Sequence, residues 1–181
     1  MVLEVMRANV GNIKQGCLLF PTIEHMITSP AGQRLKHLLK SIPTMILVFL
    51  TWLVSLLPRS ILAGFVRFWL TLTKTANVTD ACLSATLDLI NPTVIANVLF
   101  LANTELQTVL DLDYELIKTL QDRIWFYYGS SDQWVPTDYY QRLLSKVPKA
   151  KAELCKREIP HAFVLSDSDL MAEIVASRCI E

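Results

Sequence analysis

The chain has 181 residues and carries 17 basic and 17 acidic side chains, so its formal net charge is zero. This balance argues against nucleic-acid binding, which requires a basic face. Hydrophobic residues make up 52% of the sequence and the mean hydropathy is +0.36, which is high for a soluble domain of this length.

The first 23 residues predict a helix followed by a strand. Residues 1–8 form a helix-compatible run that begins without a cap, and residues 17–20 form a compact apolar strand that ends at Pro21. Glu4 and Arg7 lie within the first turns, so the start does not have the pattern of a signal peptide. We therefore expect residues 1–23 to be a helix and a strand of the domain core.

Residues 24–118 predict a helical insertion that acts as a lid, with a strongly apolar part at about residues 41–73. Residues 41–58 include no charged side chain, and residues 61–73 are interrupted only by Arg67. Each run is shorter than the ~20 residues that a membrane-spanning helix needs, and Pro58 separates the two. We expect a helical hairpin that enters one lipid leaflet; the alternative is a buried hairpin that covers an acyl pocket.

The rest of this insertion and the C-terminal end also predict helices. Asn91 is the expected cap of a helix whose first residue is Pro92. Its apolar stripe consists of Val94, Ile95, Val98, Leu99, Ala102 and Leu106. Residues 114–121 and 167–178 predict two further helices, the second with Ser166 as a candidate cap.

Two predicted strands in residues 119–181 each lead to one polar residue. Residues 124–128 are aromatic and β-branched, and Asp132 follows them after Gly129. Residues 152–155 form a second short strand candidate, and His161 follows it. An acid and then a histidine, each just past a strand, is the order of the second and third members of a Ser–Asp–His triad in α/β-hydrolases. The pattern therefore predicts an α/β fold with Asp132 and His161 as candidate catalytic residues.

The nucleophile that this pattern requires has no motif in the sequence. A nucleophile elbow, G-x-S-x-G, needs two glycines four positions apart. The glycines lie at positions 11, 16, 32, 64 and 129, and no two of them have that spacing. Because the nucleophile sits on a strand-to-helix turn, we expect the chain to begin inside the helix that follows the absent serine.

Several blocks of the sequence resemble the lipid droplet-associated hydrolase family. These blocks are Gly16–Met26, Ser29–Gly32, Phe126–Gly129 with Asp132 and Trp134, and Ile159–Phe163. The resemblance runs along nearly the whole chain but covers only the C-terminal part of such proteins. It implies an α/β-hydrolase fold in which Asp132 is the triad acid and His161 the triad base. It places the serine a few residues before Met1.

The resemblance also implies a function and a location. The parent activity would be hydrolysis of a lipid ester, either a sterol ester or an acylglycerol, without a cofactor. The expected location is the surface of lipid droplets and the cytosolic face of the endoplasmic reticulum membrane, with that monolayer or membrane as partner and no nucleic acid. The competing hypothesis is a non-catalytic protein that binds lipid droplets and affects lipid storage by occupying their surface or through partners.

Other candidate sites are weaker. His25 and His37 have no carboxylate or cysteine at ligand spacing, so we expect packing or surface histidines and no metal site. Glu24 and His25 follow the first strand and could line the site, although a plain loop position is the simpler expectation. Asn77 begins a glycosylation sequon that we expect to be unused. The four cysteines are not paired in CxxC motifs, and we expect free thiols.

Overall fold

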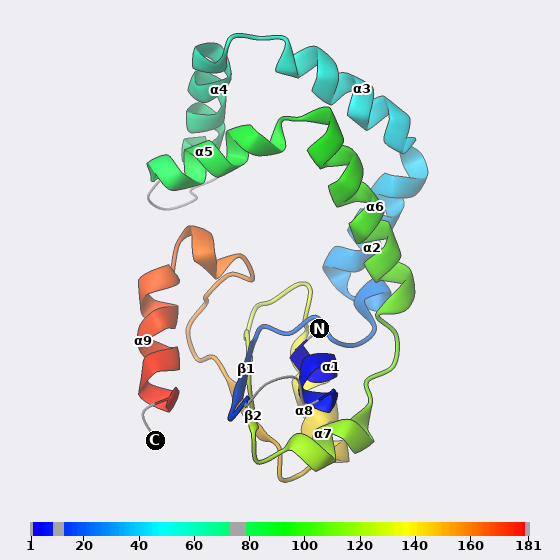
Figure 1. The fold of residues 1–181 in the computed structure, drawn as a ribbon, viewed down its shortest axis with the longest axis vertical. Helices are drawn as coiled ribbons and strands as arrows, with labels where there is room; N and C mark the ends of the chain where they lie inside the picture. The colour runs from blue at the N-terminus through cyan, green and yellow to red at the C-terminus, as the bar shows by residue number, and fades with distance from the viewer. Residues whose placement is uncertain (1, 9–12, 73–78, 180–181) are drawn as a thin grey trace. The chain divides into compact units, whose positions relative to one another are not determined.

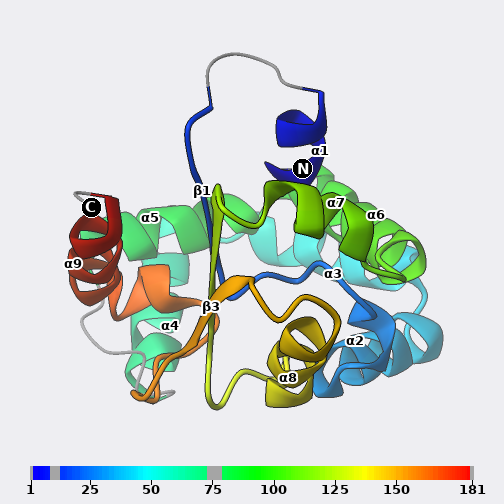
Figure 2. The ribbon, with the colours of Figure 1, turned by 90° about the horizontal axis from the view of Figure 1, so that it is seen from below.

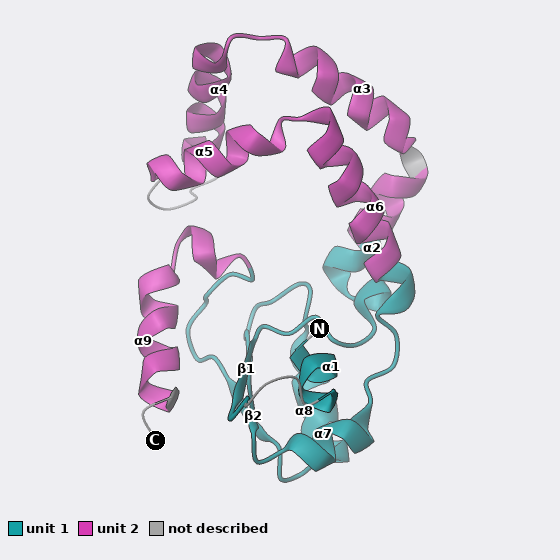
Figure 3. Ribbon diagram, in the orientation of Figure 1, with its two compact units in different colours: residues 1–33, 106–161 teal, residues 34–105, 162–181 magenta. Residues whose placement is uncertain are grey.

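The computed structural model describes residues 2–8, 13–72 and 79–179. They form two compact units, shown in Figure 3. The first unit contains residues 1–33 and 106–161, and the second contains residues 34–105 and 162–181. The protein is mixed α/β and mostly helical, with three parallel strands in the first unit. The predicted division into residues 1–23, 24–118 and 119–181 stays a prediction.

The three strands of the first unit form one sheet in the order β1-β2-β3. They are β1 Gly16–Leu19, β2 Ile124–Tyr128 and β3 Lys151–Leu154. Leu18 pairs with Phe126, and Phe126 pairs with Ala152. All five residues of β2 are buried, as expected of a central parallel strand. The bounds of β2 confirm the prediction, whereas β1 and β3 each begin and end one residue earlier than expected.

Three helices pack on one side of this sheet, as Figures 1 and 2 both show. They are α1 Val2–Arg7, α7 Tyr114–Leu120 and α8 Thr137–Lys146. Met6 of α1, Ile117 of α7 and Leu143 of α8 share a core with β2. The first two helices were predicted from the sequence and α8 was not; Asp138 and Arg142, four residues apart on α8, form an ion pair.

The loop after β1 is fixed by a serine cap and a close backbone approach. It contains a short 3₁₀ helix, η1 Met26–Thr28, and leads into α2 Pro30–Ser41. The Ser29 hydroxyl accepts a hydrogen bond from the Gly32 amide at 3.0 Å and donates one to the Met26 carbonyl at 2.8 Å. A Cβ atom on Gly32 would lie 2.0 Å from the Met26 carbonyl oxygen, so this position requires glycine.

The second unit consists of helices. It contains most of α2, then α3 Thr44–Ser55, α4 Arg59–Leu72, α5 Asp80–Leu89, α6 Pro92–Thr108, η2 Phe163–Leu165 and α9 Ser168–Cys179. The cap at Asn91 is confirmed, because its Oδ1 accepts hydrogen bonds from the amides of Thr93 at 2.9 Å and Val94 at 3.4 Å. The cap at Ser166 is wrong: α9 begins at Ser168, and the Asp167 carbonyl accepts the first helical hydrogen bond from Met171.

The apolar hairpin expected from residues 41–73 stays a prediction. Pro58 separates α3 from α4 as predicted, and α4 packs against α5. Val66 and Leu70 of α4 share a small core with Cys82 and Leu83 of α5.

Both arginines of α4 bind carboxylates of α5. Arg59 pairs with Asp88 at 3.0 Å, and Arg67 pairs with Asp80 at 2.9 Å. No single helix in the described part of the chain is long and apolar enough to cross a membrane. Two helix pairs bent at a short break reach that length and composition together: Pro30–Lys40 with Thr44–Ser55, and Asp80–Leu89 with Pro92–Thr108.

Candidate active site

Asp132 lies in the turn that follows β2, and its carboxylate is held by backbone amides. Its Oδ1 accepts hydrogen bonds from the amides of Trp134 at 2.7 Å and Val135 at 3.2 Å. The side chain is fully buried. These bonds close a local turn around the aspartate, so Oδ1 is occupied and Oδ2 has a fixed direction.

His161 lies in the loop that follows β3, and its ring is hydrogen-bonded to Oδ2 of Asp132. Nδ1 of His161 is 2.7 Å from Oδ2 of Asp132. Ile159, which is buried, anchors this loop two residues earlier. The histidine side chain is 34% exposed, and within the described residues its ring makes no other hydrogen bond. With the Nδ1 proton donated to the carboxylate, Nε2 is left as an accessible acceptor, which is the arrangement of a general base.

Two aromatic rings flank this imidazole. Phe20, the residue after β1, has its ring centroid 6.4 Å from that of His161, and Trp134 lies at 6.3 Å. Phe20 has φ of 46°, a left-handed conformation that a phenylalanine rarely adopts. Gly129 allows the close approach, because a Cβ there would lie 3.1 Å from that of Asp132 and 3.5 Å from the Phe20 ring.

The three strands therefore bring their carboxyl ends to one site. Phe20 follows β1, Asp132 follows β2 and His161 follows β3, as is usual for sites on parallel sheets. Sequence reasoning found the acid and the histidine and missed Phe20. The signal was available, since Phe20 ends the predicted strand of residues 17–20, just as Asp132 follows the predicted strand of residues 124–128.

Glu24 does not join this pair and instead anchors the loop after β1. Its side chain is 1% exposed, and Oε2 accepts hydrogen bonds from the Tyr114 hydroxyl and from Arg142 Nη1, each at 3.2 Å. Burial raises the pKa of Glu24 above its ordinary value, and the charge of Arg142 opposes that rise. Burial, and then the charge of Glu24, raise the pKa of Tyr114 to about 12.

His25 also serves the loop. Its φ is 41°, its carbonyl accepts a hydrogen bond from the Tyr139 hydroxyl at 2.9 Å, and its Nε2 lies 3.5 Å from Oδ1 of Asp111. No group of three or more histidine, cysteine or acidic side chains in residues 2–8, 13–72 and 79–179 is placed to hold a metal ion. Cys17, Cys82 and Cys155 are not in disulfide bonds. The sequon at Asn77 and the side chain of Cys179 lie outside what the structure describes.

Together these features define a mixed α/β protein whose parallel strands present a buried acid and a half-exposed histidine at one edge. A family model described as lipid-droplet associated hydrolase matches residues 1–164. The chain therefore belongs to the lipid droplet-associated hydrolase family.

Individual relatives agree. The lipid droplet-associated hydrolase of Gallus gallus is 35% identical over 176 residues, which cover 97% of this chain and 53% of the relative. That of Rattus norvegicus is 35% identical over 159 residues, covering 88% and 47%. That of Drosophila melanogaster is 31% identical over 165 residues, covering 91% and 53%. The chain spans about half the length of these curated relatives.

Proposed function

We propose that this chain is the C-terminal part of a serine hydrolase of the α/β-hydrolase fold that acts on lipid esters. The observation that carries the proposal is the 2.7 Å contact between Asp132 Oδ2 and His161 Nδ1 at the carboxyl edge of parallel strands. Family membership supports it, since the matching relatives are named lipid droplet-associated hydrolases. The substrate is a neutral lipid ester, either a sterol ester or an acylglycerol.

In this mechanism His161 moves the proton and Asp132 holds the ring. Nε2 of His161 takes the proton of the serine hydroxyl as the oxygen attacks the ester carbonyl, and then returns it to the leaving alcohol. Asp132 fixes the tautomer and stabilises the imidazolium that forms in between. The structure gives Asp132 two backbone donors on Oδ1, which hold the direction of its carboxylate.

The nucleophile and the oxyanion donors come, in this proposal, from the half of the family sequence that this chain does not match. β1 is a terminal strand of the described sheet, so one further strand has a place beside it. A strand and turn that carry a serine there would lie next to Phe20, on the same edge as His161. In this proposal the helix that follows such a turn is the short helix α1, which packs on the core of the first unit.

The proposed location is the surface of lipid droplets and the cytosolic face of the endoplasmic reticulum membrane. The support comes from the names of the relatives and from the apolar surface of the second unit. α3 has no buried residue and no charge. Its exposed apolar side chains include Met45, Phe49, Leu50, Trp52 and Leu53. Exposed apolar side chains gathered on one helix are typical of a surface that contacts lipid or another protein.

Turnover of a short-chain ester tests the proposal. The chain is joined behind the half of the Gallus gallus relative that it does not match, and this chimera is assayed beside the chain alone. We expect turnover by the chimera, loss of that turnover in the chimera with His161→Ala, and background rates for the chain alone. Clear turnover by the chain alone that His161→Ala abolishes would contradict the proposal that the nucleophile comes from the other half of the family sequence. A folded chimera without turnover would contradict the proposal that Asp132 and His161 are catalytic.

A non-catalytic role on droplets is the second candidate. It is favoured by one observation: in the part of the chain that the structure describes, no hydroxyl or thiol is hydrogen-bonded to His161. On this reading the chain binds the droplet surface through α3 and changes lipid storage by occupying it. It predicts that His161→Ala has no effect on storage in cells that express the chain, whereas loss of droplet binding does.

A further inference from the structure

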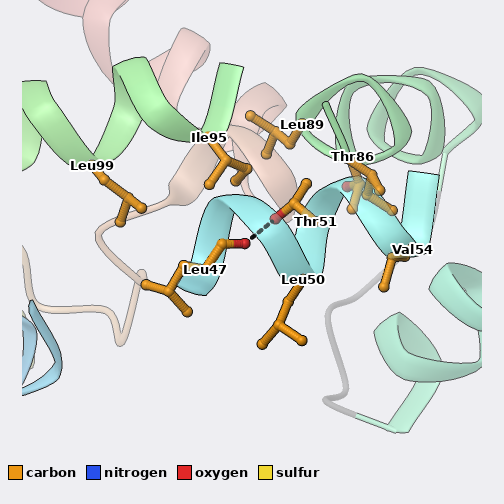
Figure 4. A pocket seen from close by; sticks show the side chains of 9 residues that line it. Leu47, Leu50, Thr51, Val54, Thr86, Leu89, Ile95 and Leu99 are labelled. Carbon is orange, nitrogen blue, oxygen red and sulfur yellow. Dashed lines mark hydrogen bonds between the residues drawn. The ribbon is translucent and has the colours of Figure 1, made fainter. Parts of the chain in front are cut away.

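A hollow in the second unit is lined by three helices and is open to solvent, and none of these helices carries the acid–histidine pair. It has a volume of about 430 Å³ and lies between α3, the end of α5 and the start of α6 (Figure 4). Its aliphatic lining comes from Leu47, Leu50, Val54, Leu89, Ile95 and Leu99. This volume is in the range of small-ligand sites, which lies between about 300 and 1,000 Å³.

The lining offers no polar group to a ligand. Thr51 and Thr86 are its only hydroxyl-bearing members, and each donates to a carbonyl one turn earlier in its own helix. Thr51 Oγ1 donates to the Leu47 carbonyl and Thr86 Oγ1 to the Cys82 carbonyl, both at 2.8 Å. Because burying an unpaired polar group is unfavourable, this lining rejects polar molecules and peptide backbone and accepts hydrocarbon.

Two walls of the hollow belong to helices that are joined by a bend. α5 and α6 meet at an angle of 86°, and α3 supplies the third wall. The Asn91 side chain caps the first amides of α6 and so fixes where the bend falls. A bend with its own hydrogen bonds keeps the two walls apart without a bound ligand.

The mouth of the hollow lies on the apolar face of α3. Leu50, Val54 and Leu89 line the hollow and are also between 42% and 50% exposed. Leu50 and Val54 belong to α3, on which Phe49 and Leu53 are exposed as well. The hollow therefore opens on the surface through which, in the proposed function, the protein contacts a lipid monolayer.

We propose that this hollow binds one acyl chain of a phospholipid drawn from the droplet monolayer. The inference rests on the proposed droplet location for the source of the lipid. The uncharged lining matches hydrocarbon, the volume suits a single chain rather than a bilayer segment, and the mouth faces the surface where phospholipid chains are the nearest hydrocarbon. The bound chain would hold the second unit on the droplet by a specific contact in addition to general apolar adsorption.

Photolabelling tests this site. The probe is a phosphatidylcholine with a diazirine on one acyl chain, presented in two ways: in the monolayer of a triolein emulsion, and in mixed detergent micelles. After irradiation, labelled positions are mapped by mass spectrometry. We expect label to concentrate on residues 47–54 and 89–99 in both preparations, and excess unlabelled phosphatidylcholine to reduce it in micelles.

Filling variants supply the contrast. Ile95→Trp with Leu99→Trp occupies the hollow and should lower its labelling about tenfold, and the milder Ile95→Phe should give a smaller loss if the double variant fails to fold. Leu101→Trp is the matched control, since Leu101 is exposed on the same helix outside the lining and should leave labelling unchanged. Even labelling along the apolar face, or unchanged labelling after filling, would overturn the site. A different result would overturn the droplet location instead: the protein does not bind the emulsion, but its labelling in micelles is saturable.

Discussion

Replacing Arg142 by methionine should destabilise the first unit by about 2 kcal/mol at pH 7. Glu24 is 1% exposed, and Arg142 is its only charged hydrogen-bond partner in the structure as described. Removing one member of a fully buried ion pair costs about 3–5 kcal/mol. The Arg142 side chain is 35% exposed, so solvent screens the pair and about half that figure is appropriate. Loss of the contact of Arg142 with the Tyr139 ring adds about 0.5 kcal/mol.

The same change should be strongly pH-dependent. Burial already places the pKa of Glu24 above its ordinary value of 4.5, so its ionisation opposes folding as the pH rises through the folded-state pKa. Without Arg142 that pKa rises further, and the variant bears a larger penalty once Glu24 is ionised. Below pH 4.5 the carboxyl is protonated in both states. The difference between variant and parent should therefore shrink to less than about 1 kcal/mol near pH 4.

Urea unfolding in a mild non-ionic detergent, followed by tryptophan fluorescence, measures both free energies. Trp125 and Trp134 lie in the first unit and report on it alone once Trp52 and Trp69 of the second unit are replaced by phenylalanine. Asp138→Asn is the control, since Asp138 is exposed and its bond to Arg142 should contribute less than about 0.5 kcal/mol. Adding Glu24→Gln to Arg142→Met should restore part of the loss at pH 7. A loss of equal size at pH 4 and pH 7 would refute the reasoning, because it would show that the charge of Glu24 is not its cause.

Three other changes follow from the same structure. Gly32→Ala should destabilise the first unit by about 3 kcal/mol, since its Cβ would lie 2.0 Å from the Met26 carbonyl oxygen. The Cβ of Gly64→Ala in α4 meets no other atom, so this change should stabilise the second unit by up to about 1 kcal/mol. Equal effects of the two changes in thermal melts would contradict this. Leu50→Arg with Leu53→Arg should release a fluorescent fusion of the chain from droplets in oleate-fed cells, because placing each arginine in the apolar layer costs about 2.5–3.5 kcal/mol. Phe20→Leu should leave the location of the fusion unchanged. Droplet coating that persists in the arginine variant would count against α3 as the contact. Finally, the chain should aggregate in plain buffer and stay dispersed with detergent, because the edge of β1 and the apolar face of α3 are uncovered; a monomeric, cooperatively melting sample in buffer would show that reasoning to be wrong.

Local patterns were sufficient to predict the elements that position the site. The apolar run that ends at Gly129 predicts β2. The order of Asp132 before His161, each just past a strand, indicates that the two residues act together. Asn91 followed by Pro92 gives the start of α6. These features depend on residues close together in the chain, so a single sequence contains the information.

The features that sequence reasoning missed depend on contacts between distant residues. α4 packs on α5 through the small core of Val66, Leu70, Cys82 and Leu83, and no local pattern says which helix supplies the partner face. The left-handed backbone of Phe20 is set by tertiary packing against Tyr127 and His161. Glu24, which follows β1 as a site residue would, is bound instead by Arg142 from 118 positions further along.

A double-mutant cycle on the chimera tests the central claim, that Asp132 and His161 act as one acid–base unit. We expect Asp132→Asn to lower kcat for a short-chain ester by on the order of 10⁴, and His161→Ala to lower it by on the order of 10⁶. Because Asp132 acts only through the imidazole, the double variant should be no slower than His161→Ala alone. Losses that multiply in the double variant, or turnover that survives His161→Ala, would contradict the assignment.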